Sequence, residues 1–318
     1  MTRTKRLIGL GLLAIVVAAC TGSGGTSASP SAATSEPPTS AAPSAPASEA
    51  PPSEAVSCAK EDLALITPGT LTIGTDNPAY PPYFEFVDEP TEPWELGDPT
   101  TGNGFESAFA YALAEELGFA KEEVAWTVVK FDQAFAPGPK PFDIDINQIS
   151  YDPQRAENVD MSEGYYFVNQ AIVAREGTPA AEATTIAALK PLTFGAQVGT
   201  TSFEAIETVI QPTTETSVYD TNDAAIEALK VGQIDAIVVD LPTAFFITAA
   251  QMEDGVIVGQ LEGSQDADAE YFSVVLTKDS PLTECVNEAI TAMQSDGRLE
   301  AITQEWLSDK ADAPVLRP

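Results

Sequence analysis

The chain has 318 residues, of which 48 are acidic and 15 are basic, so its formal net charge is −33. Such an acidic protein is a poor partner for nucleic acid or anionic lipid, although acidity also serves solubility and identifies no substrate. The sequence contains no histidine, the side chain that most often acts as an acid, base or metal ligand near neutral pH. We therefore expect no metal ion and no other cofactor.

Residues 1–20 have the pattern of a signal peptide. Three basic residues precede the apolar run Leu7–Ala19, which is too short to span a bilayer as a mature helix. The run ends in Val17-Ala18-Ala19-Cys20, and small residues followed at once by cysteine resemble a bacterial lipobox. This pattern implies cleavage before Cys20 and lipidation of its thiol. The alternative is an ordinary secretory peptide with a chance cysteine.

Residues 21–57 are rich in Ser, Pro, Ala and Thr. Such a segment buries too little apolar surface to offset its chain entropy, so we expect a disordered tether. With a lipid at Cys20, the tether would keep a folded domain outside the cytoplasm and anchored to the cell membrane.

Two further cysteines, Cys58 and Cys285, form an even pair. Outside the cytoplasm such a pair predicts a disulfide, and two buried free thiols are the alternative. A disulfide would fix the start of the folded domain to a segment near its end.

The first half of the folded part predicts strands and one clear helix. Apolar residues at alternate positions or in short runs predict strands at 71–75, 124–129, 142–146 and 167–174. Apolar residues three and four positions apart predict a helix over Gly104–Leu117, and Gly118 is a suitable end for it. The succession of strand, helix and strand favours a right-handed parallel crossover.

The second half continues the alternation. We expect strands at 192–198, 216–219, 234–239, 256–258 and 271–276. Helices are expected at 202–210, at 221–230 with Thr221 as its cap, from Pro242, at 282–294 and at 299–307. The fold class is therefore α/β, with two lobes that each contain a small, mostly parallel sheet flanked by helices. The first lobe is expected to be discontinuous, comprising 58–172 and 260–318, and the second to comprise 173–259.

Five motifs occur in order along the chain: GTDNPAYPPY, GFESAFAYALAEELG, ISYDPQRAENVDMSEGYY, QVGTTS and IDAIVVD. Taken together they resemble the bacterial extracellular solute-binding proteins of family 3, which bind polar amino acids. The resemblance covers nearly all of residues 60–310. It implies the two-lobe, type II periplasmic-binding fold, which closes on an amino acid and delivers it to the permease of an ABC importer.

The resemblance also implies a binding site. Arg155 matches the family's carboxylate-binding arginine, and a planar guanidinium can donate two parallel hydrogen bonds to a carboxylate. The alternative is a surface or ion-paired arginine. Ser150 matches a hydroxyl position near the ligand ammonium. Asp152 stands where the family usually has threonine or serine, so no contact is assigned to it.

The second lobe would supply the opposite side of the site. Gly199, Thr200 and Thr201 match the family's glycine–threonine turn, with an ordinary helix cap as the alternative. Asp240 matches the acid that pairs with the ligand ammonium at the carboxyl end of a strand. The alternative role for Asp240 is a cap for the helix at Pro242.

Four further residues are expected around the ligand side chain. Tyr80 and Phe131 match aromatic positions that sandwich it, with core packing as the alternative. Asp76 and Glu106 stand where relatives place polar or acidic groups near its tip. Alternatively, Asp76 caps a turn and Glu106 is a favourable charge at a helix start. Two acids would favour a cationic or amide side chain over a carboxylate.

The sequence thus predicts a monomeric binding protein that is not an enzyme. Cyclic-acid dehydratases share the fold, and carboxylates alone can perform acid–base chemistry, so an enzyme is an alternative. A lipoprotein that senses its ligand for a membrane receptor is another, since both roles require closure on a ligand.

Overall fold

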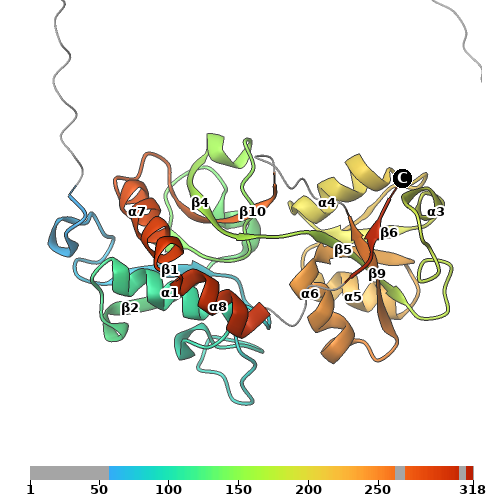
Figure 1. Cartoon of the computed structure of the whole chain (residues 1–318), viewed down its shortest axis with the longest axis horizontal. Coiled ribbons are helices and arrows are strands. Elements are labelled where there is room, and N and C mark those ends of the chain that lie inside the picture. Colours follow the sequence, from blue (N-terminus) through green and yellow to red (C-terminus); the bar gives the residue numbers. More distant parts are fainter. Residues whose placement is uncertain (1–56, 262–268, 308–312, 318) are drawn as a thin grey trace, which may run out of the picture. The chain divides into compact units, whose positions relative to one another are not determined.

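The computed structural model describes residues 57–261, 269–307 and 313–317 (Figure 1). The predicted signal peptide, the lipidation site at Cys20 and nearly all of the predicted tether lie outside the described residues. Within the described ranges, no helix is both long and apolar enough to cross a membrane.

The first sheet contains five strands in the described part of the chain, in the order β2-β1-β3-β10-β4. These strands are β1 (Leu71–Thr75), β2 (Val124–Val128), β3 (Ile144–Asp145), β4 (Val159–Phe167) and β10 (Tyr271–Thr277). The β1 strand is parallel to β2 and β3, whereas β10 is antiparallel to β3 and β4. The sheet is therefore mixed and not mostly parallel as expected, because the returning strand β10 inserts between two earlier strands and is antiparallel to both.

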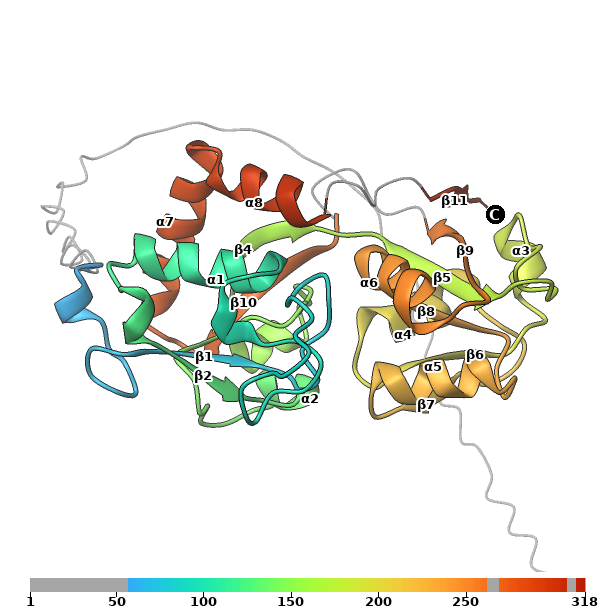
Figure 2. The same ribbon diagram turned by 90° about the horizontal axis from the view of Figure 1, so that it is seen from below.

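Three helices cover one face of this sheet: α1 (Phe105–Glu116), α7 (Leu282–Ser295) and α8 (Arg298–Leu307) (Figure 2). Their apolar residues form one core with Leu71 and Ile73 of β1 and with Phe272 of β10. A smaller cluster on the sheet contains Val129 and Phe142. Short helices connect these elements: η1 (Lys60–Asp62), η2 (Pro99–Thr101), η3 (Lys121–Glu123), α2 (Phe131–Ala134) and η4 (Arg155–Glu157).

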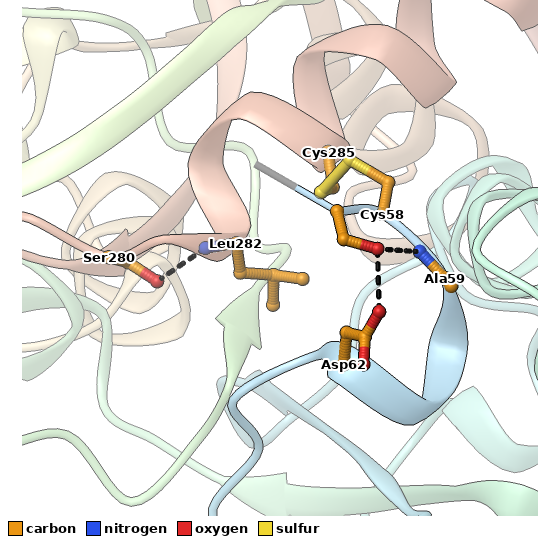
Figure 3. Close-up of a disulfide and its surroundings, with 7 residues drawn as sticks. Cys58, Ala59, Asp62, Ser280, Leu282 and Cys285 are labelled. Atoms are coloured by element: carbon orange, nitrogen blue, oxygen red, sulfur yellow. Dashed lines mark hydrogen bonds between the residues drawn. A yellow bond between two sulfur atoms is a disulfide. The ribbon is translucent and has the colours of Figure 1, made fainter. Parts of the chain in front are cut away.

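The predicted disulfide is confirmed. Cys58 and Cys285 are bonded, so the segment before η1 is covalently joined to α7 (Figure 3). Cys285 is buried in the first core and Cys58 packs against it. The C-terminal helices α7 and α8 therefore belong to the first lobe, as expected from the sequence.

The second sheet contains six described strands in the order β11-β9-β5-β8-β6-β7. They are β5 (Gln170–Arg175), β6 (Phe194–Gln197), β7 (Ser217–Tyr219), β8 (Ala236–Asp240), β9 (Gly255–Leu261) and β11 (Val315–Leu316). β5 is antiparallel to β8 and β9, whereas β6 is parallel to β7 and β8. β11 is parallel to β9.

Alternate residues of the central strands pack into different cores. Ile172 and Val238 belong to one apolar cluster, and Val173 and Val239 belong to another. Burial on both faces explains why β8 reads as a continuous apolar run. The accompanying helices are α3 (Ile186–Leu189), α4 (Thr201–Ala205), α5 (Asn222–Lys230) and α6 (Leu241–Phe246), with the π-helical turns η5 (Ile206–Ile210) and η6 (Ile247–Gln251).

The structure differs from the expected division of the chain in two places. The expected boundary at 172/173 falls inside β5, and β9 extends past residue 259 in the second sheet. Val315 and Leu316, expected in the first lobe, pair with Gln260 and Leu261 of the second sheet. The physical reason is the open edge of β9, which these last residues cover by forming a parallel pair.

Candidate functional site

A pocket with about 610 Å³ of empty space, part of it open to solvent, brings residues of the two lobes together. Seven of the ten predicted ligand-binding residues line it: Asp76, Tyr80, Phe131, Arg155, Thr200, Thr201 and Asp240. The rest of the lining consists of Asn147, Gln148, Gln197, Ser202, Asn222, Val239 and Thr243. The lining is therefore mostly polar, and it carries charges of both signs.

Arg155 begins η4, and the turn before it is fixed by Asp152. The Asp152 carboxylate accepts hydrogen bonds from the backbone N–H groups of Gln154 (2.8 Å) and Arg155 (3.0 Å). This is the local capping that a short acidic side chain makes in a turn. Asp152, to which the sequence assigned no contact, thus orders the backbone that carries the arginine.

The Arg155 side chain is 8% exposed and its orientation is fixed. Its Nη1 donates to the Ser150 carbonyl (2.6 Å) and its Nη2 donates to the Gly199 carbonyl (2.7 Å). Its Cζ lies 4.5 Å from the ring centroid of Phe135 and 5.6 Å from that of Phe131. Burial lowers the pKa of Arg155, opposed chiefly by the charge of Asp152. A guanidinium nevertheless stays protonated in proteins, so the pocket wall carries a cation. The surface-arginine alternative does not hold.

Asp240 stands at the carboxyl end of β8 and lines the same pocket. Its side chain makes no capping hydrogen bond to α6, so the capping role weighed as an alternative is absent. Instead its Oδ1 accepts from Gln170 Nε2 at 2.8 Å. Burial and the nearby charge of Glu270 raise the pKa of Asp240 to about 8, opposed by the hydrogen bond from Gln170.

Gln170 connects this acid to a second one. Its Nε2 also lies 3.1 Å from Glu270 Oε1, and its Oε1 accepts from Ser202 Oγ at 2.6 Å. One amide therefore contacts two carboxylates that come from different sheets, since Asp240 ends β8 and Glu270 precedes β10. This arrangement brings two acids together in a site that also contains Arg155, and a pocket of this kind suits a ligand with both a cationic and an anionic group.

Three of the ten predicted residues do not line the pocket. Ser150 is buried and its Oγ donates to Glu270 Oε1 at 2.6 Å, and Gly199 contributes its carbonyl to Arg155. Glu106 is fully buried beneath the wall, where it accepts from the Gln148 backbone N–H (2.7 Å) and the Tyr165 hydroxyl (2.5 Å). The expected direct contact of Glu106 with a ligand is therefore wrong, because its carboxylate is fully buried outside the pocket lining and accepts hydrogen bonds from Gln148 and Tyr165.

Thr200 and Asp76 line the pocket, and each also has the structural role that the sequence left open as an alternative. Thr200 caps α4, since its Oγ1 accepts from the Phe203 N–H at 3.1 Å. Asp76 accepts from the backbone N–H groups of Asn77 (2.7 Å) and Phe131 (3.2 Å). Burial raises the pKa of Asp76 against these two hydrogen bonds.

Sequence reasoning missed several groups of the site. Asn147 and Gln148 immediately precede the recognised Ile149-Ser150 motif, and Gln197 ends the strand before the glycine turn. Their positions next to these motifs could have identified them as pocket residues. Gln170 and Glu270 belong to no recognised motif. They come together only through the pairing of strands far apart in the chain.

Comparison with known proteins identifies the family of the chain and relatives that bind amino acids. The sequence profile of the bacterial extracellular solute-binding proteins, family 3, matches residues 71–309. The L-cystine-binding protein TcyJ of Escherichia coli (strain K12) is 31% identical over 243 residues, which are 75% of this chain and 82% of TcyJ.

Solved structures share the architecture. An ancestral arginine-binding protein bound to arginine is 26% identical with a TM-score of 0.60, over 75% of this chain and 98% of that chain. The ancestral amino acid-binding protein AncCDT-1, a precursor of cyclohexadienyl dehydratase, is 27% identical with a TM-score of 0.60, over 75% of this chain and 95% of that chain. The prediction of a two-lobe, type II periplasmic-binding fold is confirmed.

Proposed function

The chain belongs to the bacterial extracellular solute-binding proteins of family 3, and we propose that it captures one amino acid in the described pocket and delivers it to an ABC importer. One observation carries the proposal. Arg155, a cation, and Asp240, a carboxyl group that an ammonium can bind and deprotonate, line the same pocket, as the carboxylate and ammonium of an amino acid require. The names of similar proteins that bind L-cystine and arginine support this class of ligand.

The pocket suggests a role for each remaining group. Thr200 and Thr201, which line the same pocket as Arg155, are assigned to the ligand carboxylate. Glu270, held by Gln170, is assigned to the side of the ligand ammonium. Tyr80, Phe131 and Asp76 surround the ligand side chain. Because Asp76 adds an acceptor there, polar or cationic amino acids are favoured.

The partners follow from the family and from the sequence. A permease of an ABC importer receives the amino acid. Lipidation of Cys20 anchors the protein to the extracytoplasmic side of the cell membrane. The tether of residues 21–57 lets the monomeric folded domain extend away from the membrane surface.

Isothermal titration calorimetry with the twenty amino acids tests the proposal. At least one should bind, and Arg155→Ala should weaken it at least about a hundredfold, since a charge-assisted hydrogen bond contributes roughly 1.5–3 kcal/mol and two are lost. Arg155→Lys keeps the charge without the planar pair of donors and should also bind poorly.

Arg298→Ala is the matched control. Arg298 pairs with Glu116 and Asp296 and does not line the pocket, so its removal should leave affinity unchanged. Thermal melting establishes that each variant is folded. Full affinity in a folded Arg155→Ala protein would refute the proposed site, and the absence of binding by any amino acid would refute the function.

The likeness to AncCDT-1, named as a precursor of a dehydratase, favours one alternative function. Asp240, with its raised pKa of about 8, could serve as a general acid for a cyclic acid that Arg155 binds. Incubation with a cyclohexadienyl acid separates the two functions. Turnover that Asp240→Asn abolishes would establish the enzyme, and binding of an amino acid without turnover would support the binding protein.

A further inference from the structure

We propose that Glu106, although it does not line the pocket, sets the side-chain specificity of the site by fixing the orientation of the Gln148 amide. In this orientation the pocket presents the amide oxygen of Gln148, an acceptor, to the ligand. The inference rests on the proposed amino-acid binding and narrows its substrate class. The side chain of the bound amino acid should carry an N–H donor, as an amide, a guanidinium or an ammonium does.

Glu106 is 0% exposed in the first turn of α1, and both of its oxygens accept hydrogen bonds. Oε1 accepts from the Gln148 backbone N–H (2.7 Å) and from the Tyr165 hydroxyl (2.5 Å). Oε2 accepts from the side-chain Nε2 of Gln148. Backbone and side chain of one pocket residue are therefore bound to a single buried carboxylate.

The backbone contact also keeps Gln148 in an unusual conformation. Its φ of 48° lies in the left-handed region, which a residue with a side chain seldom adopts. Such a conformation persists where surrounding contacts determine it, often at a binding site. The hydrogen bond from the Gln148 N–H to Glu106 is one of these contacts.

The orientation of the amide follows from the chemistry of its partner. An ionised carboxylate only accepts, so the NH₂ group of Gln148 must face Glu106 and the oxygen must point elsewhere. Within the described residues no group donates to Gln148 Oε1, while Gln148 lines the pocket. The atom of this amide that remains for a ligand is therefore the acceptor.

A second acceptor points to the same class of ligand. Asp76 lines the same pocket as Gln148. A carboxylate on the ligand side chain would therefore meet two acceptors, the Asp76 carboxyl and the Gln148 amide oxygen, and neither residue would offer it a donor. An N–H donor satisfies both. Leaving a buried polar group unpaired costs roughly 1–3 kcal/mol, which corresponds to about tenfold or more in affinity.

Glu106→Gln provides a test with a specific outcome. The Gln148 backbone N–H can only donate, so the oxygen of the new amide should stay at the position of Oε1. Its NH₂ group then takes the position of Oε2 and faces the Gln148 side chain. The Gln148 amide must rotate to offer its oxygen to this new donor, and the pocket then receives Nε2, a donor.

The measurement is a ratio of dissociation constants at pH 8, by calorimetry or ligand-induced thermal shift. Burial raises the pKa of Glu106 to about 7, against the hydrogen bonds from Tyr165 and Gln148, so the carboxylate is largely ionised at this pH. The two ligands are L-glutamate and the amino acid with an N–H donor side chain that binds most tightly. The wild-type protein should prefer the donor, and Glu106→Gln should lower this preference about tenfold or reverse it.

Tyr165→Phe is the matched control. It removes the other hydrogen bond to Oε1 but leaves the Gln148 side chain on Oε2. It should lower stability and leave the ratio unchanged, which separates amide orientation from a general loosening of the wall. If Glu106→Gln fails to fold, Gln148→Met supplies the second test, because a thioether has a similar length but presents no amide oxygen, so the preference should be lost.

Each outcome decides between the two claims. A wild-type protein that binds no amino acid refutes the proposed function and the inference with it. Binding with an unchanged ratio in a folded Glu106→Gln protein, or in Gln148→Met, overturns only the inference. Wild-type preference for glutamate over every N–H donor would also overturn the inference and leave the function intact.

Discussion

The bond between Cys58 and Cys285 should be a major source of the stability of the folded domain. The two residues are 227 positions apart. In the chain-entropy model, a cross-link over a loop of this length lowers the entropy of the unfolded chain enough to stabilise the fold by about 5 kcal/mol at 25 °C. Since whole domains are stable by only roughly 5–15 kcal/mol, this is a large fraction of the total.

Cys58→Ala/Cys285→Ala removes the cross-link, and alanine avoids placing a hydroxyl in the core that buries Cys285. Urea unfolding should show a loss of about 3–5 kcal/mol relative to the oxidised wild-type protein. A reductant should destabilise the wild-type protein similarly and leave the variant unchanged. No pocket-lining residue belongs to η1 or α7, so the folded variant should keep its ligand affinity. Equal unfolding free energies for the two proteins would refute the reasoning.

Two buried carboxylates give further predictions. Asp145 is 0% exposed, neither of its oxygens has a hydrogen-bond partner among the described residues, and burial raises its pKa well above the usual range, aided by the charges of Glu106 and Asp76. A raised folded-state pKa gives stability that is present at low pH and lost as pH rises. Asp145→Asn should therefore increase the free energy of unfolding by about 1–3 kcal/mol at pH 8. The gain should shrink toward pH 4 in urea titrations, and parallel pH profiles for the two proteins would contradict this. Asp240→Asn should weaken amino-acid binding about 10- to 100-fold by calorimetry. Asp240→Asn should not lower the melting temperature of the ligand-free protein, because the substitution removes a buried acid that lies near the charge of Glu270. If the variant unfolds, Asp240 has a structural role instead.

Local patterns in the sequence predicted most of the elements. The strand at Leu71–Thr75 has the predicted bounds, the helix over Gly104–Leu117 forms as α1, and Thr221 caps α5 by accepting from the Ala224 N–H. Alternation, three- and four-residue spacing and caps depend on neighbours in the chain, so they can be read without the fold. The strand β4 was missed because its buried residues do not alternate regularly, and its pairing with β10 contains two register shifts.

The sequence by itself determined that Arg155 lies in a turn among polar residues and that an acid, Asp240, ends a buried strand. Only the tertiary structure decided which groups share the pocket. Glu106 meets Gln148 across 42 positions of the chain, and Gln170 meets Glu270 across 100. Each of these contacts depends on the register between strands and on the packing of α1 beneath the pocket wall. No local pattern encodes such geometry, because it arises only when distant segments are buried together.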